Sequence, residues 1–131
     1  MLETDLLHLG SNTNLVDNIC WGPQVYNITA NASRGVYGKD ATSSNIITNP
    51  FPASDAVIWS GQGINGGDPG LQLWVSGSLI DNMVPMAEIV SKRNDMLYGS
   101  FRVGMKITGI PGTCGAFFFA SFFPQWSHHA R

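Results

Sequence analysis

The most regular alternation of hydrophobic and polar positions lies in residues 98–119, which read YGSFRVGMKITGIPGTCGAFFF. From Tyr98 to Lys106 the side-chain character alternates, which predicts a strand with one buried face. The Ile110-Pro111-Gly112 stretch combines two residue types that favour a turn. From Gly115 to Phe119 a second, very apolar strand begins. The segment therefore predicts a strand, a turn and a strand in succession.

Short hydrophobic runs separated by turn residues occupy much of the remaining chain. The runs predicted as strands are residues 4–9, 21–29, 45–48, 56–59 and 71–75, of which the last alternates most cleanly. We expect a glycine-flanked bend at 35–40 and a long turn at 60–70. Residues 85–96 have a weak helical spacing, but we favour a strand followed by a loop. Many short strands between turns predict an all-β fold, an antiparallel β-sandwich.

Composition narrows the class of partner. The 131 residues carry a formal net charge of −2, and the seven Lys and Arg residues are scattered. Because no basic stripe is present, we do not expect a nucleic-acid partner. The longest apolar run, Ala116–Phe123, is far shorter than the ~20 residues that a membrane-spanning helix needs, so we expect no membrane span.

Three stretches of the sequence resemble one known family. They are ETDLLHL at 3–9, GGDPGLQLWV at 66–75 and VPMAEIVSKRNDMLYGSFRVGMKITGIPGTCGAFFF at 84–119. These look like successive strands of the glycoside hydrolase family 16 domain, in its fungal secreted β-glucanase and transglycosidase-like branch. The resemblance implies a concanavalin A-like jelly roll, with two curved antiparallel sheets and a sugar lying across the concave one. It also implies action on the O-glycosidic bonds of β-glucan by a retaining mechanism, as a hydrolase or a transglycosidase.

The resemblance covers about residues 2–119. Sandwiches of this type often run to roughly 200–250 residues as one domain. We therefore expect 1–119 to be an incomplete family 16-like sandwich and 120–131 to be a divergent tail. A truncated or mis-spliced gene model would give both departures from the family pattern, and a real short isoform is the alternative. The loss of later strands would leave apolar faces and strand edges open, from which we expect poor solubility and weakly cooperative unfolding.

The resemblance implies catalysis by a Glu-x-Asp-x-Glu strand, and no such triplet occurs in this sequence. Its only glutamates are Glu3 and Glu88. The Glu3-Thr4-Asp5 stretch has alternating acids but is terminal and lacks the third one. Glu88 lies between apolar neighbours, and we interpret it as a partly buried acid paired with Lys92 or Arg93 rather than as a sugar contact. We therefore assign no catalytic residue and expect the chain to be inactive as a glycosidase.

Contact with a sugar could persist without catalysis, because aromatic faces stack on pyranose rings. The resemblance places Phe118 where the family lines its cleft, and Arg102 where relatives carry a polar sugar-binding residue. Trp59, beside the glycine-rich turn, is a third candidate, whereas Trp74 is expected in the core. The alternative is that the phenylalanines at 117–119 all belong to the core. At the level of the chain, the alternatives are a non-catalytic carbohydrate-binding module and a non-functional fragment.

No cofactor or metal is expected. His128-His129 has no acid or cysteine near it in sequence and is interpreted as an exposed tail. The glycines at 61–67 precede a proline and a strand rather than a helix, which does not fit a phosphate-binding loop.

Two sequons and two cysteines bear on the compartment. Asn27-Ile28-Thr29 and Asn31-Ala32-Ser33 match the N-glycosylation pattern, although such triplets also arise by chance. The resemblance implies an extracellular or cell-wall location, while the first residues do not have the pattern of a signal peptide. We interpret Cys20 and Cys114 as two buried thiols, or one of them as having lost its partner with missing sequence, in preference to a disulfide between them.

Overall fold

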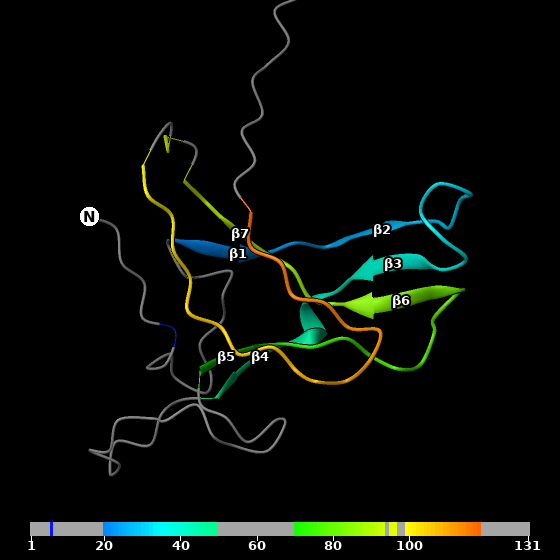
Figure 1. Ribbon diagram of the computed structural model, residues 1–131. Helices are drawn as coiled ribbons and strands as arrows, with labels where there is room; N and C mark the ends of the chain where they lie inside the picture. The colour runs from blue at the N-terminus through cyan, green and yellow to red at the C-terminus, as the bar shows by residue number, and fades with distance from the viewer. Residues whose placement is uncertain (1–5, 7–19, 50–69, 94, 97–98, 119–131) are drawn as a thin grey trace, which may run out of the picture. The chain divides into compact units, whose positions relative to one another are not determined.

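The computed structural model describes residues 6, 20–49, 70–93, 95–96 and 99–118 (Figure 1). The chain divides into two compact units, Met1–Asn94 and Asp95–Arg131. Each unit is described by itself. The expected boundary between residues 119 and 120 lies outside the described residues, as do the predicted strand at 56–59 and all of the one at 4–9 except Leu6.

The first unit is built from strands. Its described strands are β1 (Trp21–Pro23), β2 (Tyr26–Ile28), β3 (Gly38–Ala41), β4 (Ile46–Asn49), β5 (Gly70–Leu73), β6 (Met83–Met86) and β7 (Ile89–Ser91). A single 3-10 turn, η1 (Ser43–Asn45), precedes β4. The described residues contain no α-helix, which confirms the all-β class. Within the same residues, no helix is long and apolar enough to cross a membrane.

A three-stranded sheet in the order β2-β3-β6 is the largest in the described residues (Figure 1). Strands β2 and β3 are antiparallel, with Tyr26 opposite Ala41, and β3 and β6 are parallel, with Gly38 opposite Met83. The parallel pair corrects the expectation of purely antiparallel sheets. Its cause is topological, because the chain leaves β3, forms β4 and β5 elsewhere, and re-enters the sheet beside β3 in the same direction.

Gly38 explains why these three strands approach so closely. A Cβ at this position would lie 2.5 Å from the carbonyl oxygen of Ile28 and 2.6 Å from Cγ of Met83. Both distances are shorter than real side chains tolerate, so only glycine fits here. The expected bend at 35–40 therefore ends at residue 37, and the last part of that stretch is strand β3.

Two further antiparallel pairs complete the described strands of the first unit. Strands β1 and β7 pair with Gly22 opposite Val90, and β4 and β5 pair with Ile46 opposite Leu73. Beyond β5, the backbone N–H of Trp74 donates to the carbonyl of Asn45 at 2.9 Å. These pairings confirm the strands expected at 21–29, which divides in two, at 45–48 and at 71–75. The strands β6 and β7 confirm that residues 85–96 begin as strand and not as helix.

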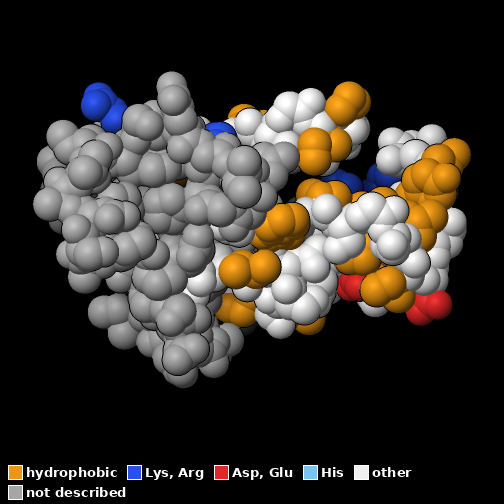
Figure 2. All heavy atoms as spheres, turned by 90° about the horizontal axis from the view of Figure 1, so that it is seen from below, with side chains coloured by type: hydrophobic (Ala, Val, Ile, Leu, Met, Phe, Trp, Pro, Cys, Tyr) orange, Lys and Arg blue, Asp and Glu red, His pale blue; other side chains and the backbone are white. Residues whose placement is uncertain are grey.

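The interior of the described residues is lined by small side chains. The buried positions are Gly22, Gly38, Ala41, Gly70 and Pro85. Large hydrophobic side chains instead reach the surface of the described part at several places (Figure 2). Trp74, expected in the core, is 40% exposed, and its indole N–H donates to Oε1 of Gln72 at 3.0 Å. Trp74 directly follows β5, which ends at Leu73.

In the second unit, the predicted turn is present but the predicted strands are not. The N–H of Thr113 donates to the carbonyl of Ile110 at 3.3 Å, and Gly112 has a φ of 88°. Proline followed by a residue with positive φ is the pattern of a type II turn. A Cβ on Gly115 would lie 3.4 Å from Cγ1 of Ile107, so the chain folds back on itself around the turn.

No strand is assigned in residues 99–118, which corrects the expectation for Tyr98–Lys106 and Gly115–Phe119 as far as these are described. The alternating apolar side chains at 101, 103, 105 and 107 are 39–56% exposed. A strand needs both a hydrogen-bonded neighbour and a buried face, and glycines such as Gly104 weaken it further. The apolar and polar side chains of this segment do alternate along the sequence. Its described residues, however, have no hydrogen-bonded neighbouring strand.

Candidate functional site

The two described candidates for sugar contact both lie in the second unit. Phe118 is 70% exposed, and Phe117 beside it is 45% exposed. The choice between a sugar contact and a core position for these phenylalanines stays a prediction. Arg102 is also exposed, and within the described residues no hydrogen bond or ion pair engages its guanidinium group. No contact within the described residues joins Arg102 to Phe118. The third candidate, Trp59, lies outside the described residues.

A side-chain pair that the sequence did not reveal joins β2 to the β6–β7 connection. The hydroxyl of Tyr26 donates to Oε2 of Glu88 at 2.5 Å, and the backbone N–H of Gln24 donates to the carbonyl of Glu88 at 2.9 Å. Glu88 is half-buried, as expected. Its expected ion pair with Lys92 or Arg93 stays a prediction. The hydrogen-bonding partners are 62 positions apart, so no local pattern could have identified Tyr26.

The Tyr26–Glu88 pair alters the acidity of the phenol. The hydrogen bond to Glu88 raises the pKa of Tyr26 above its ordinary value of 10.0, and partial burial and the negative charge of Glu88 act in the same direction. The phenol therefore stays protonated at neutral pH and serves as a hydrogen-bond donor. The hydrogen bond between Tyr26 and Glu88 links two segments of the fold. It does not supply the pair of carboxyl groups that a retaining glycosidase uses.

The second sequon forms a tight turn between β2 and β3. The side-chain Oδ1 of Asn31 accepts hydrogen bonds from Ser33 Oγ at 2.8 Å, Ser33 N at 3.1 Å and Arg34 N at 3.0 Å. The N–H groups of Arg34 and Gly35 also donate to the Asn31 carbonyl, each at 3.0 Å. Gly35 closes the turn with a φ of 116°, which glycine adopts without strain.

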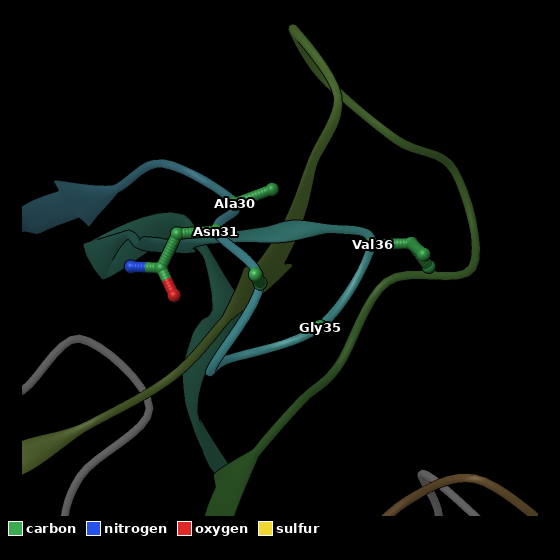
Figure 3. Close-up of a pocket in the computed structure, with 5 residues that line it drawn as sticks. Ala30, Asn31, Gly35 and Val36 are labelled. Carbon is green, nitrogen blue, oxygen red and sulfur yellow. The ribbon is translucent and has the colours of Figure 1, made fainter.

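A hollow of about 330 Å³ lies at this turn, lined by Ala30, Asn31, Ala32, Gly35 and Val36. Figure 3 shows the side chains of Asn31 and Val36 pointing away from each other across the turn. The lining contains one polar side chain and no aromatic ring, so it does not resemble a sugar-binding groove. The hollow leaves the sequon accessible from solvent.

The first sequon has a different geometry. Asn27 is exposed in the middle of β2, opposite Asp40 of β3. Within the described residues, no hydrogen bond joins Asn27 to Thr29. Thr29 lies just beyond the last residue of β2.

The described residues otherwise offer little metal or redox chemistry. They contain no group of three or more His, Cys, Asp or Glu side chains that could hold a metal ion. The His128-His129 stretch lies outside the described residues. Cys20 is half-buried and Cys114 is exposed, so the expectation that both thiols are buried is wrong for Cys114. The two cysteines belong to different units, and the preference for thiols over a disulfide stays a prediction.

The described part thus has exposed phenylalanine and arginine side chains in the second unit, a hydrogen bond between Tyr26 and Glu88 in the first, and an exposed sequon turn. No protein-family model, curated protein or solved structure matches this chain.

Proposed function

We propose that this chain is a β-glucan-binding domain of the glycoside hydrolase family 16 type, with a jelly-roll architecture, that holds its polysaccharide without cleaving it. The proposal combines the sequence resemblance with the exposed aromatic surface of the second unit. It places the protein at the cell wall or outside the cell, where such a polysaccharide is found.

The observation that carries the proposal is the exposure of Phe118. Phe118 is 70% exposed and so offers an apolar side chain on which a ligand can stack. The apolar C–H face of a pyranose ring matches such a surface. The adjacent Phe117 is itself 45% exposed.

Arg102 supplies the polar component that a sugar ligand needs. The guanidinium group presents five N–H donors, and glucan hydroxyl groups accept such hydrogen bonds readily. A combination of apolar rings with a few polar donors is typical of ligand sites in general.

We expect no cleavage because the sequence does not provide a suitable pair of acids. A retaining glycosidase holds two carboxyl groups about 5–5.5 Å apart. The only glutamate among the described residues, Glu88, is bonded to Tyr26, and the nearest acids in the sequence are Asp81 and Asp95. The whole sequence contains no Glu-x-Asp-x-Glu triplet that would bring three acids to one face of a strand.

Co-sedimentation with insoluble β-1,3-glucan tests the binding. We expect the wild-type chain to pellet with the glucan and Phe118→Ala to pellet much less. The matched control is Tyr37→Ala, which removes an aromatic ring of the first unit that is 51% exposed and should leave binding unchanged. Equal retention of all three proteins would contradict the assignment of Phe118, and no retention of the wild type would favour the non-functional fragment.

The same incubation separates a binding domain from an enzyme. We expect no release of reducing ends from laminarin or mixed-linkage glucan above the level of a protein-free sample. Release by the purified chain would refute the proposal and restore a glycosidase.

A further inference from the structure

The turn at residues 31–35 carries a modification site that the sequence alone leaves undecided. Two sequons lie four residues apart, and their triplets are equally good matches to the pattern. The structure treats them differently. We propose that Asn31 carries a single N-linked glycan and that Asn27 is not modified.

The first reason is the geometry of the amide. All three hydrogen bonds of the Asn31 side chain end on Oδ1, and one of them comes from the hydroxyl of Ser33, the third residue of the sequon. Within the described residues Nδ2 makes no hydrogen bond. The nitrogen that would bond to the sugar is therefore unengaged and belongs to an exposed residue.

The second reason is electronic. In the transfer, Nδ2 forms a bond to C1 of the sugar of a lipid-diphosphate-linked oligosaccharide, and the bond from C1 to the phosphate oxygen breaks. The diphosphate leaves with the bonding electron pair, and Nδ2 passes one proton to a base of the transferase. As that proton leaves, negative charge develops on the amide oxygen, where the donors from Ser33 and Arg34 stabilise it. Asn27 has no such donors among the described residues.

The third reason is that the turn is local. Its hydrogen bonds connect residues at most four positions apart, so the geometry can form before the sheets assemble. Asn27 adopts its position only as part of β2, which is extended and paired with β3. Because the two asparagines are four residues apart, a glycan on Asn31 also obstructs the approach of a transferase to Asn27.

The test is expression of the full chain behind a cleavable secretion leader in a eukaryotic host, with removal of the leader as proof of entry into the secretory pathway. We expect one glycan, seen as a shift in intact mass that peptide N-glycosidase F abolishes. Peptide mapping should find the resulting aspartate at position 31. Asn31→Gln should lose the shift, and Asn27→Gln should retain it.

Ser33→Ala is the matched control for folding. It removes the sequon hydroxyl but keeps the backbone donors from residues 33 and 34, so it should lose the glycan without losing the turn. A glycan on Asn27 in the wild type, glycans on both residues, or an unmodified chain whose leader has been removed would each overturn the proposal. Since glucan binding is measured on chain from a bacterial host that adds no N-linked glycan of this type, this inference stands or falls independently of the proposed function.

Discussion

At the scale of single residues, the first unit is linked by contacts between positions remote in sequence. Tyr26 and Glu88 connect β2 to the segment between β6 and β7. The amide Nδ2 of Asn45 donates to Ser76 Oγ at 3.2 Å and thereby links η1 to the chain beyond β5. A hydrogen bond to a charged group contributes about 1.5–3 kcal/mol when buried, and less in a half-exposed pair such as Tyr26–Glu88.

The raised pKa of Tyr26 gives a prediction at this scale. Because the neutral phenol donates to Glu88, its contribution to stability is fully present below the ordinary tyrosine pKa and is lost as the pH rises through the raised value. A spectrophotometric titration of tyrosinate in the wild type and in Tyr26→Phe isolates this group by difference. We expect the missing component to be centred above pH 10.0.

Glu88→Gln is the control for that titration. It keeps a hydrogen-bond acceptor but removes the negative charge, so the Tyr26 component should move down towards its ordinary value. A component at or below pH 10.0 in the wild type would contradict the hydrogen bond.

Local features at the residue scale could be predicted from the sequence, and remote ones could not. The turn at 110–113 follows from Pro111 and Gly112, whose backbone preferences act within four residues. The partial burial of Glu88 follows from its apolar neighbours. Its partner Tyr26 could not be identified, because only the fold brings β2 beside the β6–β7 segment.

At the scale of elements, the sheet β2-β3-β6 depends on one residue without a side chain. The close approach at Gly38 leaves no room for a Cβ between Ile28 and Met83. The parallel pairing of β3 with β6 could not be predicted, because strand periodicity reports which face is buried and not which neighbour or direction a strand takes.

Substitution of this glycine tests the sheet. Gly38→Ala should destabilise the first unit by about 1–3 kcal/mol, the usual cost of overpacking, because one of the close contacts is to backbone that cannot turn aside. The matched control is Gly77→Ala, where a Cβ meets nothing within 4 Å. Urea denaturation followed by circular dichroism compares the two midpoints. Equal midpoints would show that the three strands do not meet at Gly38.

In the second unit, the alternation of apolar and polar residues predicts strands that the described residues do not form. Residues 101–107 alternate as a strand should, yet no strand is assigned there. Alternation records which side chains would share a face, and a ladder also requires a hydrogen-bonded neighbour. The described part of this unit supplies the turn and the contact between Gly115 and Ile107, but no such neighbour.

At the scale of the whole molecule, the described residues bury little apolar surface. Ala41 is the only hydrophobic side chain in the core of the described residues, whereas Val25, Val36 and Phe118 are each at least 70% exposed. Hydrophobic burial is the main favourable term in folding, so the described residues by themselves gain little from it.

Thermal unfolding tests how much apolar surface the folded chain buries. We expect a broad transition with a small enthalpy, and self-association at micromolar concentration, because exposed apolar side chains favour aggregation. Differential scanning calorimetry together with analytical ultracentrifugation measures both. A sharp transition from a monodisperse monomer would show that the isolated chain has a larger core than its described residues provide.

We propose that exposed aromatic side chains of this chain hold β-glucan. Isothermal titration of the purified chain with soluble laminarin tests this proposal. We expect measurable binding that weakens about two- to tenfold in Phe118→Ala, since one aromatic contact contributes about 0.5–1.5 kcal/mol. The same affinity in wild type and Phe118→Ala, or no heat of binding in the wild type, would contradict it.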